Sequence, residues 1–325
     1  MRLLAFSDLH LSDNPPAIRK KEPDWYQTQK NLLNEITRQV NAHSPFALII
    51  AGDLFHTSIV SPFLEAMTIK WISTIQALHS SMIIIFTPGQ HDLPGNNFKH
   101  LEKSSIEVLR CGCDLFVPES GSLFITGPKN EHAFVSVPYG EELPETIEKM
   151  RKDRTNLVSV SVITHRLLWS EKKPYPGASV KGNVRRAAKE FVGADIVISG
   201  DNHQPFDVEE NGITFINCGR CQTRTATEMN YPPPSIIKIV IDDENGGIQH
   251  QRIELDINEV LSPEESTYKT ETPKDDKDLL AFVQAVGDLG ESADDSLSFD
   301  RMLEKEFETR KTSKDVQEVL QGARL

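Results

Sequence analysis

The sequence lacks a long hydrophobic run. None of its apolar stretches reaches the roughly 18 residues of a membrane-spanning helix. The opening segment, MRLLAFSDLH, becomes polar after a few apolar residues, which is too short for the core of a signal peptide. We therefore expect a cytoplasmic protein with no membrane partner. Its 325 residues suffice for one large domain with an appendage, or for two ordinary domains.

Cysteine is scarce, with only four residues, in the close pairs Cys111–Cys113 and Cys218–Cys221. Such spacings can build a four-thiolate zinc site. Close cysteines beside strands are more often small buried hydrophobic residues, and about a hundred residues separate the two pairs. A reducing cytoplasm also argues against disulfides.

Basic residues are fewer than acidic residues. There are 35 Lys and Arg residues against 48 Asp and Glu residues, for a net charge of −13, which argues against a nucleic-acid partner. The charge is unevenly placed, however, because residues 263–325 carry nine basic and 16 acidic side chains, a difference of −7. Segment 166–189 reverses the balance and is either a solvated face or a phosphate-binding surface. Its basic residues, opposed by Glu171 alone, are Arg166, Lys172, Lys173, Lys181, Arg185, Arg186 and Lys189.

Short runs rich in Ile and Val alternate with helical patterns. The runs at 3–6, 47–51, 82–86, 158–163 and 194–199 predict strands buried on both faces. A spacing of three to four between apolar residues predicts helices over about 25–40, 62–79 and 142–152. This alternation predicts a layered α/β domain in which helices enclose sheets.

The pattern changes after Gly200. Runs at 212–217, 235–242 and 248–255 predict strands separated by turns. Residues 259–277 are polar and acidic without periodicity, which indicates a linker. The final segment, 278–325, has the spacing of two or three short amphipathic helices.

Each predicted strand of the α/β region is followed by side chains that can bind a metal. In chain order they are Asp8 and His10, Asp53 and His56, Gln90 with His91 and Asp92, His165, and finally Asp201 and His203. Ligands of open α/β sheets bind beyond the carboxyl ends of the strands, so these side chains can converge. Mixed carboxylate and imidazole ligands suit manganese, iron or zinc better than calcium. Any one motif is weak, since Gly-Asp is usually a turn, but five in this order indicate a metal site.

This order resembles the calcineurin-like metallophosphoesterase superfamily, whose pattern is Asp-x-His, Gly-Asp, Gly-Asn-His, a lone His, and Gly-His-x-His. The stretches SDLHLS and AGDLFHTSIVSP resemble the SbcD-type DNA double-strand-break nuclease subunit and its phage-encoded relatives, over roughly residues 1–256. The resemblance implies a layered αββα sandwich over 1–205, a small α+β capping domain over 206–258 and a helical tail.

The resemblance also implies a ligand set for two Mn²⁺ ions, with Mg²⁺ as a substitute. One ion is expected on Asp8, His10, Asp53 and His203, and the other on Asp53, Gln90, His165 and Asp201. His91 is expected to assist the leaving group, His56 to orient DNA, and Asp92 to hold the His91 ring from behind. Arg220 and Arg224, with the cations of 166–189, are expected to contact DNA phosphates.

Two residues depart from the family pattern. Gln90 stands where the family has Asn, and Asp201 stands where it has His. Both can still bind a cation, but Asp201 adds negative charge and favours a hard ion. The departures leave open an active enzyme with an altered second site, a one-metal enzyme, or a poor catalyst.

By resemblance, the protein is a DNA nuclease subunit of recombination, repair and replication. It is expected to act as an exonuclease on double strands and an endonuclease on single strands, as a homodimer with a coiled-coil SbcC-type ATPase. The tail helices either bind that ATPase or fold against their own domain. Two alternatives stay open: a small-molecule phosphodiesterase or phosphomonoesterase of the same superfamily, and a DNA-binding scaffold with weak or no catalysis.

Overall fold

The computed structural model describes residues 1–121, 123–126, 130–143, 147, 149, 152, 156–175 and 177–262. Residues 1–174 and 180–262 of this set belong to one compact unit. The predicted helices of the tail, and most of the predicted helix over 142–152, lie outside the described residues.

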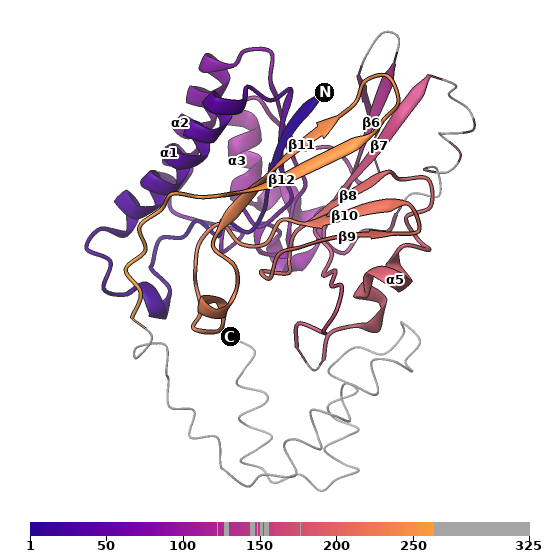
Figure 1. The fold of residues 1–325 in the computed structure, drawn as a ribbon. Coiled ribbons are helices and arrows are strands. Elements are labelled where there is room, and N and C mark those ends of the chain that lie inside the picture. Colours follow the sequence, from indigo (N-terminus) through magenta and orange to yellow (C-terminus); the bar gives the residue numbers. More distant parts are fainter. Residues whose placement is uncertain are drawn as a thin grey trace, which may run out of the picture. The chain divides into compact units, whose positions relative to one another are not determined.

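Two six-stranded sheets form the centre of this unit (Figure 1). The first sheet has the order β12-β11-β1-β2-β3-β4, with parallel pairing from β1 to β4 and antiparallel pairing of β1 with β11 and of β11 with β12. Its strands are β1 (Arg2–Phe6), β2 (Ala47–Ile50), β3 (Ile83–Phe86), β4 (Leu115–Phe116), β11 (Ser235–Ile241) and β12 (Ile248–Glu254).

The second sheet has the order β5-β6-β7-β8-β10-β9. Strands β6, β7, β8 and β10 are parallel, while β5 and β9 pair antiparallel at the two edges. The strands are β5 (Leu123–Thr126), β6 (Glu131–Val137), β7 (Leu157–Thr164), β8 (Ile196–Ser199), β9 (Phe206–Glu210) and β10 (Ile213–Asn217). The five strands predicted for the α/β region are thus confirmed, but they are divided between two sheets.

The sheets pack face to face through apolar side chains. Alternate residues of a strand point to opposite faces, so Leu3 and Ala5 of β1 join the layer between the sheets, whereas Leu4 and Phe6 face the helices. Ile163 and Ile198 of the second sheet belong to the same central layer and are fully buried. The strand ends that carry the candidate ligands are therefore held by a closely packed core.

Helices cover both outer faces. Those on the first sheet are α1 (Trp25–His43), α2 (Pro62–Leu78) and α3 (Ser105–Gly112), and the short α5 (Val184–Ala187) packs on the second. Asp24 and Ser61 cap the first turns of α1 and α2, as acceptors of backbone N–H groups. Six 3₁₀ turns complete the described elements: η1 (Ala17–Arg19), η2 (Gln90–Asp92), η3 (Pro94–Asn96), η4 (Phe98–Lys103), η5 (Val180–Gly182) and η6 (Thr227–Asn230). The αββα layering agrees with the predicted fold class.

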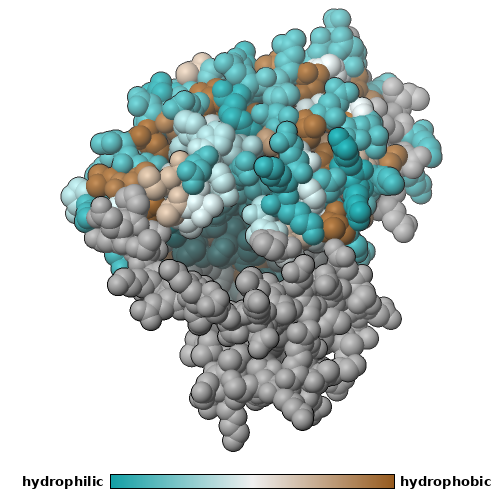
Figure 2. Space-filling view, turned by 60° about the horizontal axis from the view of Figure 1, so that its bottom comes forward, coloured by the Kyte–Doolittle hydropathy of each residue, from teal (hydrophilic) through white to brown (hydrophobic). Residues whose placement is uncertain are grey.

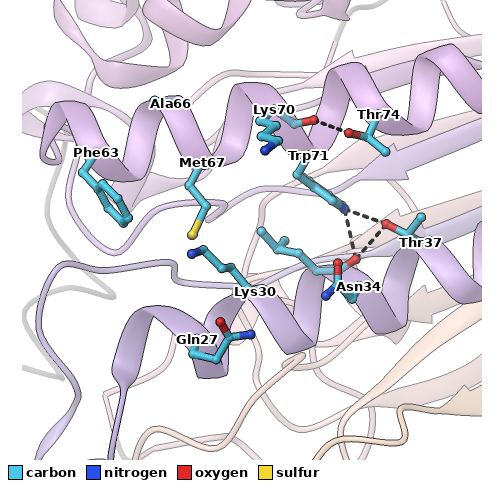
Figure 3. A pocket seen from close by; sticks show the side chains of 11 residues that line it. Gln27, Lys30, Asn34, Thr37, Phe63, Ala66, Met67, Lys70, Trp71 and Thr74 are labelled. Carbon is cyan, nitrogen blue, oxygen red and sulfur yellow. Dashed lines mark hydrogen bonds between the residues drawn. The ribbon is translucent and has the colours of Figure 1, made fainter.

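A groove runs between α1 and α2 on the outer side of the helix layer (Figure 3). Its floor includes Trp71, whose indole N–H donates to Leu33 O at 3.0 Å and so ties α2 to α1. Lys30 extends from α1 toward Phe63 of α2, with its ammonium 5.7 Å from the ring centroid. The groove shares no residue with the candidate ligands.

The predicted capping domain over 206–258 is wrong. Its strands complete the two sheets: β9 and β10 extend the second sheet beyond β8, and β11 and β12 extend the first beyond β1. Fully buried side chains such as Ile216 and Ile237 belong to the layer between the sheets. The capping domain was an implication of the resemblance, and the pairing that assigns these strands to the two sheets is not visible in local composition.

Among the described residues, no helix combines the length and the apolar character that crossing a lipid bilayer requires.

We predict that Ile237→Ala lowers the free energy of unfolding of the main transition by about 2–5 kcal/mol, because it leaves a cavity between the sheets. Val240→Ala is the matched control, since Val240 lies on the same strand but is 36% exposed. Urea unfolding followed by circular dichroism measures both. A main transition that Ile237→Ala leaves unchanged would contradict the assignment of β11 to the core.

Candidate metal centre

The loops after β1 and β2 run alongside each other. Asp8 N donates to Gly52 O at 3.0 Å, and His10 N donates to Asp53 O at 2.9 Å. This backbone pairing continues the parallel pairing of the two strands and brings two of the predicted motifs into contact.

Left-handed backbone recurs at the candidate ligands. Asp8, His10, Asp53 and Asp201 have φ values of 53°, 47°, 51° and 72°. This conformation costs an L-residue roughly 1–2 kcal/mol, so the surrounding structure must hold it in place. Unfavourable backbone of this kind clusters at functional sites.

Asp92 holds the loops together through the backbone. Its carboxylate accepts N–H groups from Gly89 at 2.9 Å, Asp53 at 2.8 Å and Phe55 at 3.1 Å. The prediction that Asp92 supports the His91 ring is wrong, because His91 Nδ1 donates to His56 O at 2.8 Å. Asp92 instead fixes the backbone that presents Asp53.

The Asp53 carboxylate lies at the centre of the cluster. One oxygen, Oδ1, accepts the His91 backbone N–H at 2.9 Å. The other, Oδ2, lies 3.3 Å from His165 Nε2, 3.7 Å from His10 Nε2 and 4.0 Å from His91 Nε2. An oxygen in this position suits the bridging role expected from the resemblance.

Asp8, His10 and His203 present ligand atoms within 4.8 Å of one another. His10 Nε2 is 3.0 Å from His203 Nε2 and 3.7 Å from Asp8 Oδ1, and His203 Nε2 is 3.6 Å from the same Asp8 oxygen. Although these residues come from different sheets, their atoms converge as expected for the first cation.

Asp8, Asp53 and His165 form a second convergent group. His165 Nδ1 donates to Ala51 O at 2.6 Å, so in the neutral ring Nε2 carries the lone pair, 3.3 Å from Asp53 Oδ2. Burial lowers the pKa of His165, but Asp53 and Asp8 more than compensate and raise it well above its ordinary value. The approach of this ring to the β2 loop requires Gly52, because a Cβ there would lie 2.0 Å from His165 Nδ1 and φ is +95°.

Gln90 and Asp201 contact each other. Gln90 Nε2 donates to Asp201 Oδ1 at 2.8 Å, and Gln90 Oε1 is buried without a hydrogen-bond partner among the described residues. Asp201 belongs to none of the three-residue groups of converging ligand atoms found in the described part of the chain. The two departures from the family pattern are therefore coupled to each other.

Unpaired buried atoms show that this donor set fits divalent cations. Buried polar atoms are almost always hydrogen-bonded in proteins. Within the described residues, the buried atoms without a hydrogen-bond partner include Asp8 Oδ1, His10 Nδ1, Asp53 Oδ2, Gln90 Oε1 and His165 Nε2. Three of the five, Asp8 Oδ1, Asp53 Oδ2 and His165 Nε2, converge on one place, with His165 Nε2 4.0 Å from the Asp8 oxygen and 3.3 Å from the Asp53 oxygen.

Burial and neighbouring charges shape the protonation of the site. Burial raises the pKa of the Asp8 carboxyl to about 6, although His165 and His203 oppose the rise. Burial also tends to raise the pKa of Asp53, but the neighbouring His165 outweighs it and holds this pKa below its usual range. Burial also lowers the pKa of His10 well below its ordinary value. Carboxylates and neutral imidazoles are the protonation states that bind metals.

His56 and His91 stand beside these groups with stacked rings, whose centroids are 5.0 Å apart at an interplanar angle of 23°. The His91 side chain is 37% exposed. Since Nδ1 of His91 donates to a carbonyl, its Nε2 is the nitrogen free to exchange a proton with a ligand.

Arg220 and Arg224 are buried, so their predicted contact with DNA is wrong. Arg224 Nη1 donates to His10 O at 2.8 Å, and Arg220 donates to Glu228 O at 2.8 Å and Pro232 O at 3.0 Å. Both guanidinium groups build the loop after β10 instead of facing solvent. The sequence could not show this, because burial of an arginine depends on distant partners.

Glu228 supports the site and carries no sequence signal. Its Oε1 accepts a hydrogen bond from His203 Nδ1 at 2.7 Å, and its Oε2 accepts the Arg224 backbone N–H at 2.7 Å. Burial lowers the pKa of His203, but Glu228 and Asp8 more than compensate and raise it above its ordinary value. The carboxylate thus directs His203 Nε2 toward Asp8.

The other predicted DNA contacts lie mostly at the surface. Lys172, Lys173, Lys181, Arg185 and Arg186 are exposed. Arg166 is partly buried and pairs with Glu190 at 2.9 Å. The segment begins beside the site, because Asn202, between Asp201 and His203, donates to Leu168 O at 2.8 Å.

The cysteines do not form a zinc site in the described residues. Cys218 and Cys221 are buried, Cys111 is exposed, and no cysteine joins a group of converging ligand atoms there. All four are free thiols, and the interpretation as small buried hydrophobic residues holds for Cys218 and Cys221 but not for the exposed Cys111.

The sequence pattern of the calcineurin-like phosphoesterase family matches residues 1–205. No curated protein matches this chain. Among solved structures, a candidate 5′-nucleotidase from Staphylococcus aureus is similar, with 13% identity and a TM-score of 0.48 over 80% of this chain. This chain spans about half of that protein, 54% of its length.

Two further structures resemble the chain over 78% of its length. The calcineurin-like phosphoesterase YfkN from Bacillus subtilis has 15% identity, a TM-score of 0.44 and 89% coverage of its own chain. A dimetal phosphatase from Danio rerio has 10% identity, a TM-score of 0.48 and 99% coverage.

We predict that Glu228→Ala weakens Mn²⁺ binding by about 10- to 100-fold, as is typical when a residue that orients a metal-binding histidine is removed. Glu228→Gln should weaken it less, because its amide oxygen can still accept the His203 N–H. Electron paramagnetic resonance of free Mn²⁺ measures the affinity, with the exposed Glu209→Gln as control. Equal affinities for wild type and Glu228→Ala would contradict the orienting role.

Proposed function

Because the chain belongs to the calcineurin-like phosphoesterase family, a family of metal-dependent phosphoester hydrolases, we propose that it is a nuclease acting on DNA phosphodiesters. The observation that supports this proposal best is the placement of His56 and His91 beside the convergent carboxylates and imidazoles. These two rings come from the LFH and QHD stretches, and the former is the part of the sequence that most resembles DNA nuclease subunits.

The proposed ligand set divides between two cations. Asp8, His10, Asp53 and His203 would hold one, and Asp53, Gln90, His165 and Asp201 would hold the other, with Asp53 shared. When bound, the cations supply Lewis-acid chemistry: they activate the attacking water and neutralise charge on the phosphate. Oxygens of Gln90 and Asp201 at the second position would favour Mn²⁺ or Mg²⁺.

His91 is proposed as the general acid. Its Nδ1 proton is committed to His56 O, so Nε2 can deliver a proton to the leaving oxygen and then recover one from solvent. The stacked His56 ring has a buried Nδ1 without a hydrogen-bond partner in the described part of the chain, and burial is the main cause that lowers its pKa to about 4. A neutral His56 would orient a DNA strand by hydrogen bonding and not by charge.

The exposed cations of 166–189 would position a DNA duplex. Arg220 and Arg224 do not belong to this surface, because they are buried. Contacts of Lys and Arg with phosphates position nucleic acid without reading its sequence. On the face that Figure 2 turns forward, many of the described side chains are hydrophilic.

We further propose that the protein is a homodimer that acts with an SbcC-type ATPase in DNA recombination and repair. The acidic, amphipathic sequence of 278–325 has the form of a partner-binding segment.

We predict that His91→Ala lowers the rate of duplex cleavage by about 10²- to 10⁴-fold, because it removes the general acid. Asp53→Asn should abolish cleavage, because it removes the bridging charge. Gel assays with linear duplex and Mn²⁺ measure both, beside a chromogenic phosphodiester. Hydrolysis of the chromogen alone would favour the small-molecule phosphodiesterase. Cleavage that neither substitution alters would come from a contaminant and favour the scaffold.

We predict that Lys172→Ala with Lys173→Ala weakens DNA binding and lowers the slope of log K against log [salt] by about 1 for each phosphate that the protein no longer neutralises. Lys30→Ala with Lys70→Ala, in the groove between α1 and α2, serves as the matched control. Fluorescence anisotropy with labelled duplex at several salt concentrations gives both slopes. Equal slopes for the two double variants would exclude the segment as a DNA-binding surface.

A further inference from the structure

Three imidazole rings, those of His10, His56 and His91, form a group whose mutually converging ligand atoms are all nitrogens, although Asp53 Oδ2 lies 3.7 Å from His10 Nε2 and 4.0 Å from His91 Nε2. One nitrogen of each ring lies within 4.8 Å of the other two. The centroids are 5.5 Å apart for His10 and His56, and 4.9 Å for His10 and His91. Nitrogens bound to one tetrahedral zinc ion stand about 3.4 Å apart when each bond is about 2.1 Å. The nitrogens therefore need to approach one another by at most about 1.4 Å to share a cation.

Hydrogen bonding leaves the nitrogens of this group available. His91 Nδ1 donates to His56 O, so Nε2 of His91 keeps its lone pair. His10 is 2% exposed, and its Nδ1 has no hydrogen-bond partner among the described residues. The same holds for the buried Nδ1 of His56. Buried imidazole nitrogens without a hydrogen-bond partner are unusual unless they bind a ligand.

We propose that His10, His56 and His91 form a nitrogen-only site for Zn²⁺ or another cation that prefers imidazole, and that occupation of this site inhibits the enzyme. Three histidines with an open fourth position are an established ligand set for zinc. Manganese and magnesium prefer sites that contain carboxylates, as the groups around Asp8 and Asp53 do.

Inhibition follows from the sharing of His10. This residue also belongs to the group with Asp8 and His203, and a neutral imidazole has one nitrogen lone pair for a cation. An ion held by His56 and His91 therefore competes with the first cation of the proposed two-metal site. It also occupies the two rings proposed to act on DNA. The inhibitory effect rests on the proposed function. The zinc-binding site itself does not depend on that function.

Titration of the full chain with Zn²⁺ alone and Mn²⁺ alone, each against a chromophoric chelator, tests the site. We expect His56→Ala to weaken Zn²⁺ binding by at least about tenfold. Removal of a residue that only orients a metal ligand already weakens binding by about this factor, and loss of a ligand should do no less. The Mn²⁺ affinity of His56→Ala should equal that of wild type. His203→Ala should weaken Mn²⁺ binding, and the exposed His100→Ala should change the affinity for neither ion. The free thiols contribute equally to all variants, so the differences isolate the histidines.

Zn²⁺ affinity that His56→Ala leaves unchanged, or Zn²⁺ and Mn²⁺ affinities that it lowers alike, would overturn the nitrogen-only site. X-ray absorption of the Zn²⁺ protein provides a second measurement, with three imidazoles expected in wild type and two in His56→Ala. If wild type binds no Mn²⁺ while His56→Ala still weakens Zn²⁺ binding, the nitrogen-only site stands and the proposed two-metal function falls.

Discussion

The burial of carboxylates among imidazoles at the junction of two sheets is the constraint on which the rest of this structure depends. A buried carboxylate without compensation is costly, so Asp8 and Asp53 need neighbours that supply positive charge or hydrogen bonds. The structure meets this need with rings from both sheets around Asp53 Oδ2 and an amide on Asp53 Oδ1. Within the described residues, one oxygen of Asp8 and one of Asp53 have no hydrogen-bond partner, and the two converge, which suits the site to cations.

The central apolar layer makes such convergence possible. Ile163 and Ile198 lie two and three residues before His165 and Asp201, while Ile49 lies four residues before Asp53, and all three belong to one close-packed cluster. Packing of this kind fixes the relative positions of strand ends that come from different sheets. The loops can therefore hold left-handed backbone at four candidate ligands.

Several charged residues around the site hold its backbone and its candidate ligands in position. Asp92 binds three backbone amides, Glu228 orients His203, and Arg224 binds the carbonyl of His10. From sequence alone, Arg224 looked like a phosphate-binding residue and Asp92 like a support for a ring. Polar side chains that satisfy buried backbone groups are part of the architecture that keeps metal-binding residues in position.

Local pattern by itself determined the strands before Asp8, Asp53, Gln90, His165 and Asp201, the helices α1 and α2, and the chemical character of the strand ends. These features depend on periodicity and on residues near one another in the chain. Tertiary structure alone decided that the strands form two sheets, that β9 to β12 complete them, that Arg220 and Arg224 are buried, and that Glu228 contacts His203. Each of these features depends on contacts between residues that lie far apart in the chain, and local composition does not show such contacts.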